Sequence, residues 1–146
     1  MTSIERARPD DLAAVETLLA ASALPLAGLE PAMATAVVAR DGGAVVGCAA
    51  VEPYGSVGLL RSVCVAPDLR GVGLGRRLVA AAEVLAGEGG IATLYLLTET
   101  AAEWFPRLGY GATERAALPA ELAASPELTG ACPDTAAAFR KPIGTS

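Results

Sequence analysis

The stretch "SVCVAPDLRGVGLGRRL", residues 62–78, places three glycines and three arginines directly after a valine-rich segment. The valines favour a strand that ends near residue 65, and the apolar spacing after Gly73 favours an amphipathic helix. Backbone N–H groups at a helix N-terminus are unsatisfied and share a favourable dipole, so phosphate is a natural ligand there. The pattern predicts a strand, a turn and a helix arranged to hold a phosphate group.

The glycine spacing excludes two common nucleotide motifs. No GxxxxGK[ST] sequence occurs, and Arg76 stands where the dinucleotide fingerprint GxGxxG needs its third glycine. A nicotinamide-dependent dehydrogenase is therefore a remote alternative. The structural alternative is that the glycines only permit a tight turn and that the arginines are solvated.

The flanking segments predict an α/β protein. A strand and a helix come first, three antiparallel strands precede the glycine-rich turn, and a buried strand parallel to residues 59–65 follows its helix. The later segments predict a short helix, a strand, a helical turn or two and a closing strand. The expected strands are 4–8, 35–40, 44–55, 59–65, 91–97, 110–118 and 134–141, and the expected helices are 9–22, 73–88, 100–108 and 119–128, with a short helix or loop over 24–33.

Length, composition and net charge limit the number of domains and the classes of binding partner. A length of 146 residues suits a single domain, residues 1–146, and no apolar run approaches the roughly 20 residues that a bilayer crossing needs. The N-terminus has no apolar signal region, so we expect a cytoplasmic protein with no membrane association. A net charge of −5 argues against nucleic acid binding.

Histidine is absent and the three cysteines, Cys48, Cys64 and Cys132, are widely spaced. Neither a disulfide framework, a common metal site nor a Ser-His-Asp triad is therefore expected.

The order of residues in "VCVAPDLRGVGLGRRL" resembles the acetyl-coenzyme A motif of the GNAT N-acetyltransferases. Arg70, Gly73 and Gly75 match the [RQ]xxGx[GA] core of that motif. The resemblance implies the GNAT fold, which has a mixed, mostly antiparallel sheet of six to seven strands, splayed between strands 4 and 5, with helices on both faces.

The resemblance also implies acetyl-CoA as the cofactor, with its pyrophosphate on the amides after Arg70 and its pantetheine arm along the preceding strand. A backbone N–H near Val65 would polarise the thioester carbonyl. The cofactor-binding residues implied are Val63, Cys64, Val65, Arg70, Gly71, Val72, Gly73, Leu74, Gly75, Arg76 and Phe105.

A second segment, "LYLLTETAAEWFPRLGYGATERAALP" at residues 94–119, is similar to the amino acid N-acetyltransferase branch, which includes the glutamate N-acetyltransferase domain. Residues 118–141, "LPAELAASPELTGACPDTAAAFRK", are similar to the small arsenic-resistance N-acetyltransferases. Both similarities imply a small acceptor with a free amino group, an amino acid or an analogue of one. The family mechanism is direct attack of the neutral amine, without a covalent acetyl-enzyme or a metal.

Two residues depart from the family pattern. Phe105 stands where many members have a tyrosine that protonates the departing thiolate, which excludes a tyrosine acid at that position. Thr98 stands where many members have a coenzyme-contacting asparagine, and its hydroxyl could replace that amide only in part.

Three acidic residues are candidates for the general base. Glu52, Glu99 and Glu103 are the candidates, and Glu52 or Glu99 could act through water. Charged residues are mostly exposed, so the alternative for each is a solvated surface acid. Arg61 lies within an apolar strand, where it could bind an acceptor carboxylate or form a structural ion pair. Trp104 could pack in the interior or wall the acceptor pocket.

Cys64 and Cys132 are not expected to be catalytic. Cys64 is expected to be a small core residue beside the cofactor, and Cys132 a structural or mildly reactive thiol.

Three functions remain open. The leading one is an acetyl-CoA-dependent N-acetyltransferase for a small amino acid-like compound, with a role in arsenic or antimetabolite resistance. A non-catalytic acetyl-CoA-binding regulator is the main alternative, and a protein acetyltransferase is weaker. A homodimer is compatible with the sequence.

Overall fold

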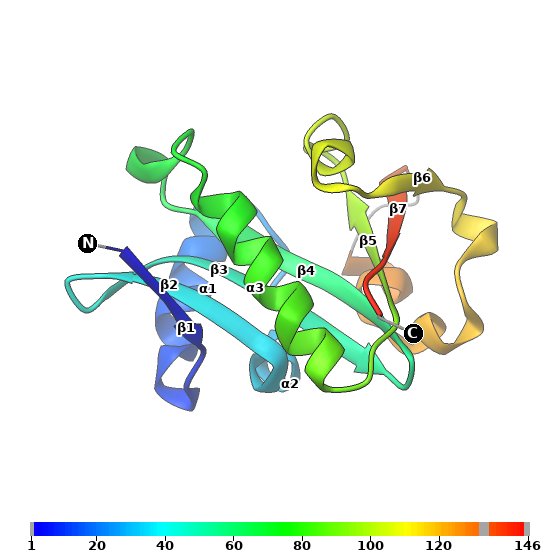
Figure 1. Cartoon of the computed structure of the whole chain (residues 1–146), viewed down its shortest axis with the longest axis horizontal. Coiled ribbons are helices and arrows are strands. Elements are labelled where there is room, and N and C mark those ends of the chain that lie inside the picture. The colour runs from blue at the N-terminus through cyan, green and yellow to red at the C-terminus, as the bar shows by residue number, and fades with distance from the viewer. Residues whose placement is uncertain (1, 132–134, 145–146) are drawn as a thin grey trace.

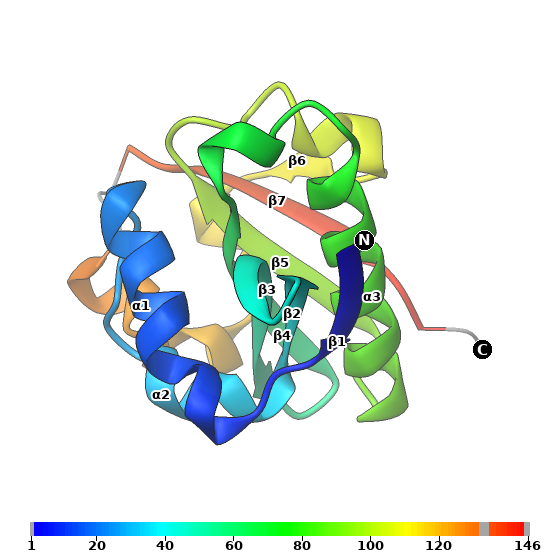
Figure 2. The same ribbon diagram turned by 90° about the vertical axis from the view of Figure 1, so that its left-hand side faces the viewer.

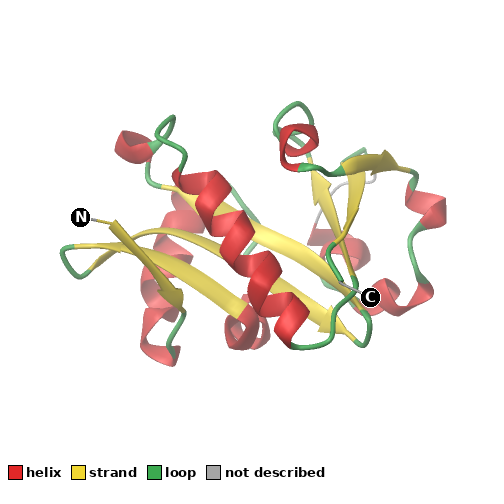
Figure 3. Ribbon diagram, viewed as in Figure 1, coloured by secondary structure: helices red, strands yellow, loops and turns green. Residues whose placement is uncertain are grey.

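The computed structural model describes residues 2–131 and 135–144. Its centre is a seven-stranded mixed sheet in the order β1-β2-β3-β4-β5-β7-β6 (Figures 1 and 3). Only β4 and β5 are parallel among the described neighbours, which confirms the predicted mixed sheet. The strands are β1 (Thr2–Arg6), β2 (Ala36–Asp41), β3 (Ala44–Tyr54), β4 (Val57–Val65), β5 (Thr93–Thr98), β6 (Gly111–Thr113) and β7 (Ala137–Pro142).

Helices cover both faces of this sheet, as the sequence predicted. Helix α3 (Leu74–Glu88) packs on one face, and α1 (Leu12–Ala21) and α2 (Leu29–Ala32) pack on the other (Figure 2). The apolar residues of α3 recur at helical spacing, so one stripe of the helix is buried against the sheet. The buried members of that stripe are Leu74, Leu78, Val79, Ala82 and Ala86.

Strands β4 and β5 begin side by side and then separate. Their pairing joins Val57–Leu59 to Thr93–Tyr95, and the two strands diverge beyond it (Figure 1). The parallel pair and its splay agree with the GNAT arrangement expected from the sequence. The later halves of both strands therefore keep one edge without a neighbouring strand.

The segment after β5 is less regular than predicted. The helix expected over 100–108 is a 3-10 turn at Phe105–Leu108, because Pro106 has no N–H to donate and Gly109 ends the turn with φ 94°. The strand expected over 110–118 shortens to β6, and three further short helical turns follow, at Arg115–Ala117, Ala120–Ala124 and Glu127–Ala131.

Helix α1 ends in a left-handed turn that uses alanine instead of glycine. Ala23 has φ 56°, its N–H donates to the Ala20 carbonyl at 3.1 Å, and the Leu24 N–H donates to Leu19 at 2.9 Å. These two bonds form a Schellman motif, in which glycine is the favoured residue at the left-handed position. The motif turns the chain sharply toward the ends of β4 and β5.

A charge cluster ties β1, β2 and the start of α1 together. Arg40 donates to Glu5 at 3.0 Å and to Asp11 at 2.6 Å, and the Arg8 N–H also donates to Asp11 at 2.7 Å. The hydrogen bond from Arg40 lowers the pKa of Asp11 below its ordinary value.

None of the described helices has the length and apolar character that a bilayer crossing requires.

Candidate active site

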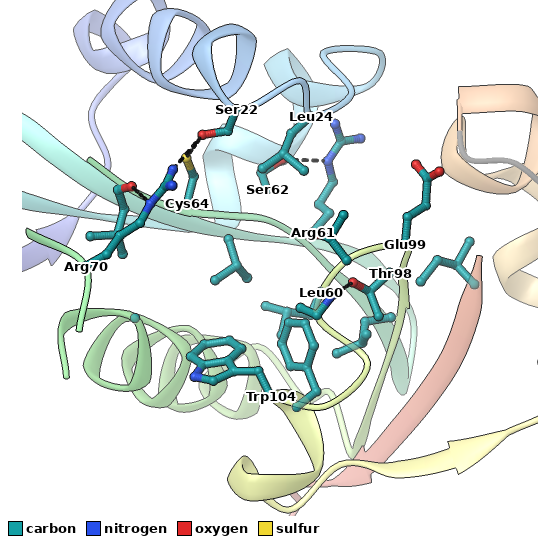
Figure 4. A pocket seen from close by; sticks show the side chains of 18 of the residues that line it. Ser22, Leu24, Leu60, Arg61, Ser62, Cys64, Arg70, Thr98, Glu99 and Trp104 are labelled. Carbon is teal, nitrogen blue, oxygen red and sulfur yellow. Dashed lines mark hydrogen bonds between the residues drawn. The ribbon is translucent and has the colours of Figure 1, made fainter. Parts of the chain in front are cut away.

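A cavity of about 880 Å³ lies where β4 and β5 separate. The glycine-rich turn bounds one side, the end of α1 bounds another, and the segment after β5 closes it (Figure 4). In Figure 4, Arg70 and Ser22 lie on the left of this cavity, whereas Thr98 and Glu99 lie on the right. The phosphate-binding turn and the strand splay therefore open into one space.

The glycine-rich turn presents backbone N–H groups to this cavity. Gly71 and Gly73 have φ values of 84° and 83°, and Gly73 precedes the first turn of α3 without any side-chain cap. A Cβ at Gly71 or Gly73 would have no neighbour within 4 Å, which leaves room for a bulky anion beside the backbone. Leu74 is buried in the core and Val72 is 71% exposed, so these two could contribute only through their backbone.

Arg70 connects the turn to β4 and to α1. Its Nε donates to the Val65 carbonyl at 3.0 Å and a terminal nitrogen donates to Ser22 Oγ at 3.1 Å. Ser22 Oγ lies 3.3 Å from Cys64 Sγ, so Cys64 lines the cavity and also packs against α1. Arg70 thus holds the turn in place, whereas Arg76 lines the cavity from the first turn of α3.

A β-bulge in β4 turns one peptide out of the sheet. The register shifts between Cys48 and Ala50, and Ser62 has φ 58°, a strained value for a residue other than glycine. The Cys48 thiol donates to the Ser62 carbonyl at 3.1 Å, and burial raises the pKa of Cys48 to about 12, which keeps the thiol protonated. Since this peptide is trans, the Val63 N–H points away from Cys48.

The N–H of Val65 also points away from β3. The next residue, Ala66, donates to the Val46 carbonyl of β3 at 2.8 Å, and successive N–H groups along a strand alternate in direction. The Val65 carbonyl lies on the edge of β4 that faces away from β3, where it accepts a hydrogen bond from Arg70 Nε. Strand β5 has already diverged from β4 at this point. Val63 and Val65 therefore direct two N–H groups from one strand edge, and both residues line the cavity.

Trp104 packs beside the glycine-rich turn. A Cβ placed on Gly75 would lie 3.2 Å from Trp104 Cζ2, and the indole meets the Phe105 ring edge-on at 4.9 Å. The Trp104 side chain therefore lies beside the N-terminus of α3, and it borders the half of the cavity that the turn forms. Phe105 is buried and supplies no proton to the cavity.

Thr98 ends β5 and lines the cavity. Its Oγ1 accepts the Ala101 N–H at 3.0 Å, so the hydroxyl already caps the following turn.

The opposite part of the cavity, which we name the far end, is lined by Arg61, Glu99 and Glu127. Arg61 is 3% exposed, and its guanidinium donates to Glu52 at 2.7 Å and to the carbonyls of Ala27 at 2.5 Å and Pro25 at 3.2 Å. Its Nε donates to Ser62 Oγ at 3.0 Å, which also supports the bulge. These contacts favour the structural ion pair over a free carboxylate ligand.

Glu52 does not belong to the cavity lining. Tyr54 donates to its second oxygen at 2.6 Å, and burial together with this contact raises the pKa of Tyr54 to about 12. Arg61 and Tyr54 therefore hold the Glu52 carboxylate within the protein, which is a poor position for a base. Glu103 is exposed and does not line the cavity either, whereas Glu99 is exposed and does.

Comparison with known proteins identifies the fold family. The acetyltransferase (GNAT) domain family matches residues 33–111, more than half of the chain. The chain belongs to the GNAT acetyltransferase family. The sequence-based identification of the family is therefore confirmed.

This GNAT domain is similar in sequence or structure to several known proteins. An amino-acid acetyltransferase of Ralstonia nicotianae is 37% identical over 84 residues, which cover 56% of this chain and 19% of that protein. The structure of N-acetylglutamate synthase from Neisseria gonorrhoeae, complexed with coenzyme A and N-acetyl-glutamate, superposes with a TM-score of 0.84 at 22% identity over 99% of this chain and 36% of that one. Rv2747 from Mycobacterium tuberculosis, solved with CoA, has a TM-score of 0.78 at 23% identity, covering 96% and 98%.

The GNAT domain thus spans about a fifth of the Ralstonia relative and about a third of the Neisseria synthase. The structures share its fold, and the family assignment comes from the sequence match.

Sequence reasoning missed Glu127 at the far end of this GNAT domain. Glu127 is 4% exposed, and its Oε2 lies 3.6 Å from Arg61 Nε although the two residues are far apart in sequence. No local pattern marks it, because it lies in an irregular segment whose position depends on contacts with β4 and with Gly28, the residue before α2. Cys132, the third cysteine, lies outside the described residues.

Proposed function

We propose that this GNAT domain is an acetyl-CoA-dependent N-acetyltransferase that acetylates the amino group of a small amino acid or amino acid-like compound. The observation that carries the proposal is the convergence of two features on one cavity. The backbone N–H groups of the glycine-rich turn, which have no side-chain cap at the N-terminus of α3, face the cavity from one side. The edge of β4 from which β5 has diverged faces it from the other.

The cavity residues suit coenzyme A by their chemistry. Backbone N–H groups from Gly71 to Arg76 would bind the pyrophosphate, because they are open and lie at the positive end of α3. The Arg76 side chain adds positive charge, and Arg70 keeps the turn in place through Val65. The bound cofactor supplies an activated acetyl thioester.

The freed edge of β4 would hold the thioester end. The N–H groups of Val63 and Val65 are donors without a partner strand on that edge, so they can line the pantetheine arm and polarise the carbonyl. The bulge at Ser62 keeps these donors preorganised, because Cys48 and Arg61 both bond to that residue. Such preorganisation stabilises negative charge on the carbonyl oxygen as the amine attacks.

The far end of the cavity would receive the acceptor. Its charged side chains suit a small polar amine. The amino-acid acetyltransferase relative and the similarity of residues 118–141 to arsenic-resistance N-acetyltransferases support an amino acid or an analogue, with a role in arsenic or antimetabolite resistance.

Direct attack by the amine suits the residues present. The amine nitrogen forms a bond to the acetyl carbon, and the electrons of the breaking C–S bond pass to the coenzyme sulfur. Phe105 cannot protonate this sulfur, so the group leaves as the thiolate. Thr98 and Trp104 would contribute to the walls of the site.

Thiol release tests this proposal. The purified chain is incubated with acetyl-CoA and a panel of amino acids, amino acid-like antibiotics and organoarsenicals, and free thiol is measured against a control without acceptor. Acceptor-dependent release supports the proposal. Coenzyme A binding is followed separately through Trp104, the only tryptophan, whose indole lines the cavity.

The two measurements also separate the alternatives. Binding of acetyl-CoA without turnover of any acceptor would favour the regulatory domain, to which the phenylalanine at the acid position would be suited. Failure of both binding and turnover would remove the coenzyme A assignment altogether.

A further inference from the structure

A buried carboxylate faces the far end of the cavity, and no step described above uses it. Glu127 begins the helical turn Glu127–Ala131 and is 4% exposed while lining the cavity. The residues before it are firmly packed, because Ser125 is fully buried and its Oγ accepts the Glu127 N–H at 3.2 Å. Pro126 lies so close to Gly28 that a Cβ there would meet it at 2.8 Å. Packing therefore fixes where Glu127 points.

Two buried carboxylates lie beside Arg61. Of the described buried side chains there, Glu52 and Glu127 are acidic and Arg61 is basic, with contacts of 2.7 Å and 3.6 Å to Arg61. Glu99 adds another carboxylate at the rim. The cavity thus presents the carboxylates of Glu99 and Glu127, which complement an ammonium group.

The two buried carboxylates are not equivalent. Glu52 receives Arg61 at 2.7 Å and the Tyr54 hydroxyl at 2.6 Å, and it does not line the cavity. Glu127 lies farther from Arg61 and faces the space into which an acceptor would enter. Arg61 therefore lies closer to Glu52, and of these two acids only Glu127 lines the cavity that an acceptor would enter.

We propose that Glu127 is the proton acceptor for the amine of the acetyl acceptor. This inference rests on the proposed function. The acceptor enters as an ammonium ion, and Glu127 takes one N–H proton, directly or through one water, and passes it to solvent. The freed lone pair forms the N–C bond as the C–S bond breaks toward sulfur, and the second N–H proton is lost to solvent or to the thiolate.

The surroundings of Glu127 define what a pH profile would report. Among the described residues, Arg61 on β4 contacts Glu127, Glu52 on β3 shares that guanidinium and accepts from Tyr54, and Glu99 at the end of β5 lines the same cavity. Burial and the contact with Glu52 raise the pKa of Tyr54 to about 12, so its phenol stays protonated near neutral pH.

Glu127→Gln tests the proposal because it removes the base and keeps the side-chain shape. We expect kcat/KM near neutral pH to fall about 100-fold or more, the usual contribution of a general base. The deficit should shrink as the pH rises, because the acceptor amine then deprotonates in solution. Glu121→Gln, the same change at an exposed site of the same segment, should match the unaltered protein. Coenzyme A affinity, read from Trp104 fluorescence, should stay within about 2-fold in both variants.

Three results would overturn the proposal. One is a Glu127→Gln variant with unaltered kcat/KM and pH profile. Another is an equal loss at every pH, which would indicate a structural role. The third is a pH-dependent loss in Glu99→Gln in place of Glu127→Gln, which would transfer the role to the rim.

A second variant covers the case in which Glu127→Gln does not fold. Glu127→Asp keeps the charge beside Arg61 and withdraws the carboxylate by one methylene, so kcat should fall about 10-fold with coenzyme A affinity unchanged. Unaltered kcat in that variant would contradict the proposal. Absence of turnover in the unaltered protein is a different outcome, since it removes the proposed function itself.

Discussion

Replacing Ala23 with glycine should stabilise this protein, although alanine-to-glycine changes usually destabilise. Ala23 holds φ 56° in the turn that ends α1, and its side chain is exposed, so the change removes strain and little packing. The left-handed conformation costs a non-glycine residue about 1–2 kcal/mol. Glycine also gains freedom in the unfolded chain, which costs about 0.4–1 kcal/mol.

The net expectation for Ala23→Gly is a gain of about 0.5–1 kcal/mol, or a rise in Tm of about 2–4 °C for a chain of this size. Ala14→Gly is the matched control, because Ala14 is an exposed residue inside the same helix. It should lose about 1 kcal/mol. Urea unfolding and thermal scans measure both variants. A loss of stability in Ala23→Gly similar to that in Ala14→Gly would refute the left-handed cap as a source of strain.

The remaining predictions concern the ion pairs and the phosphate site. Arg61→Met removes the cation beside the buried carboxylates of Glu52 and Glu127, so urea unfolding should show a loss of about 3–5 kcal/mol; a loss below about 1 kcal/mol would contradict the buried pairing. Gly73→Glu adds bulk and negative charge at the open amides, so coenzyme A affinity should fall at least about 100-fold by Trp104 fluorescence. Unchanged affinity in the folded variant would remove the phosphate assignment. Because the pKa of Asp11 is lower in the folded chain than its unfolded value of 3.8, the ionised carboxylate stabilises the fold at pH values above 3.8. This stability is lost as the pH falls through the folded pKa. Unfolding measured across that acid range should therefore show a steep decline that Arg40→Met flattens, and an unchanged decline would contradict the Arg40 contact.

Local patterns were sufficient for the order of the elements and for the phosphate turn. The change from strand to helix periodicity across residues 62–78 depends on neighbours in the chain, so it can be recognised without the fold. The buried strand at residues 91–97 was recognisable as the parallel partner of β4 for the same reason. The helix expected over 100–108 was wrong in extent, because Pro106 and Gly109 outweighed the helical spacing.

The far end of the cavity depends on contacts between distant segments. Arg61 was recognised as costly inside an apolar strand, but its pairing with Glu52 and Glu127 required the register of β3 with β4 and the docking of residues 125–127. Glu127 itself gave no signal, since a single acid in an irregular segment resembles any surface residue until packing buries it.

The sequence by itself therefore determined the family, the phosphate-binding turn and the strand that precedes it, because periodicity and glycine spacing are properties of adjacent residues. Only the tertiary structure decided which way the N–H groups of Val63 and Val65 point, and which carboxylates are buried beside Arg61. Those features arise from a bulge stabilised by Cys48 and from segments that meet across the sheet, and burial and direction are properties of the packed chain.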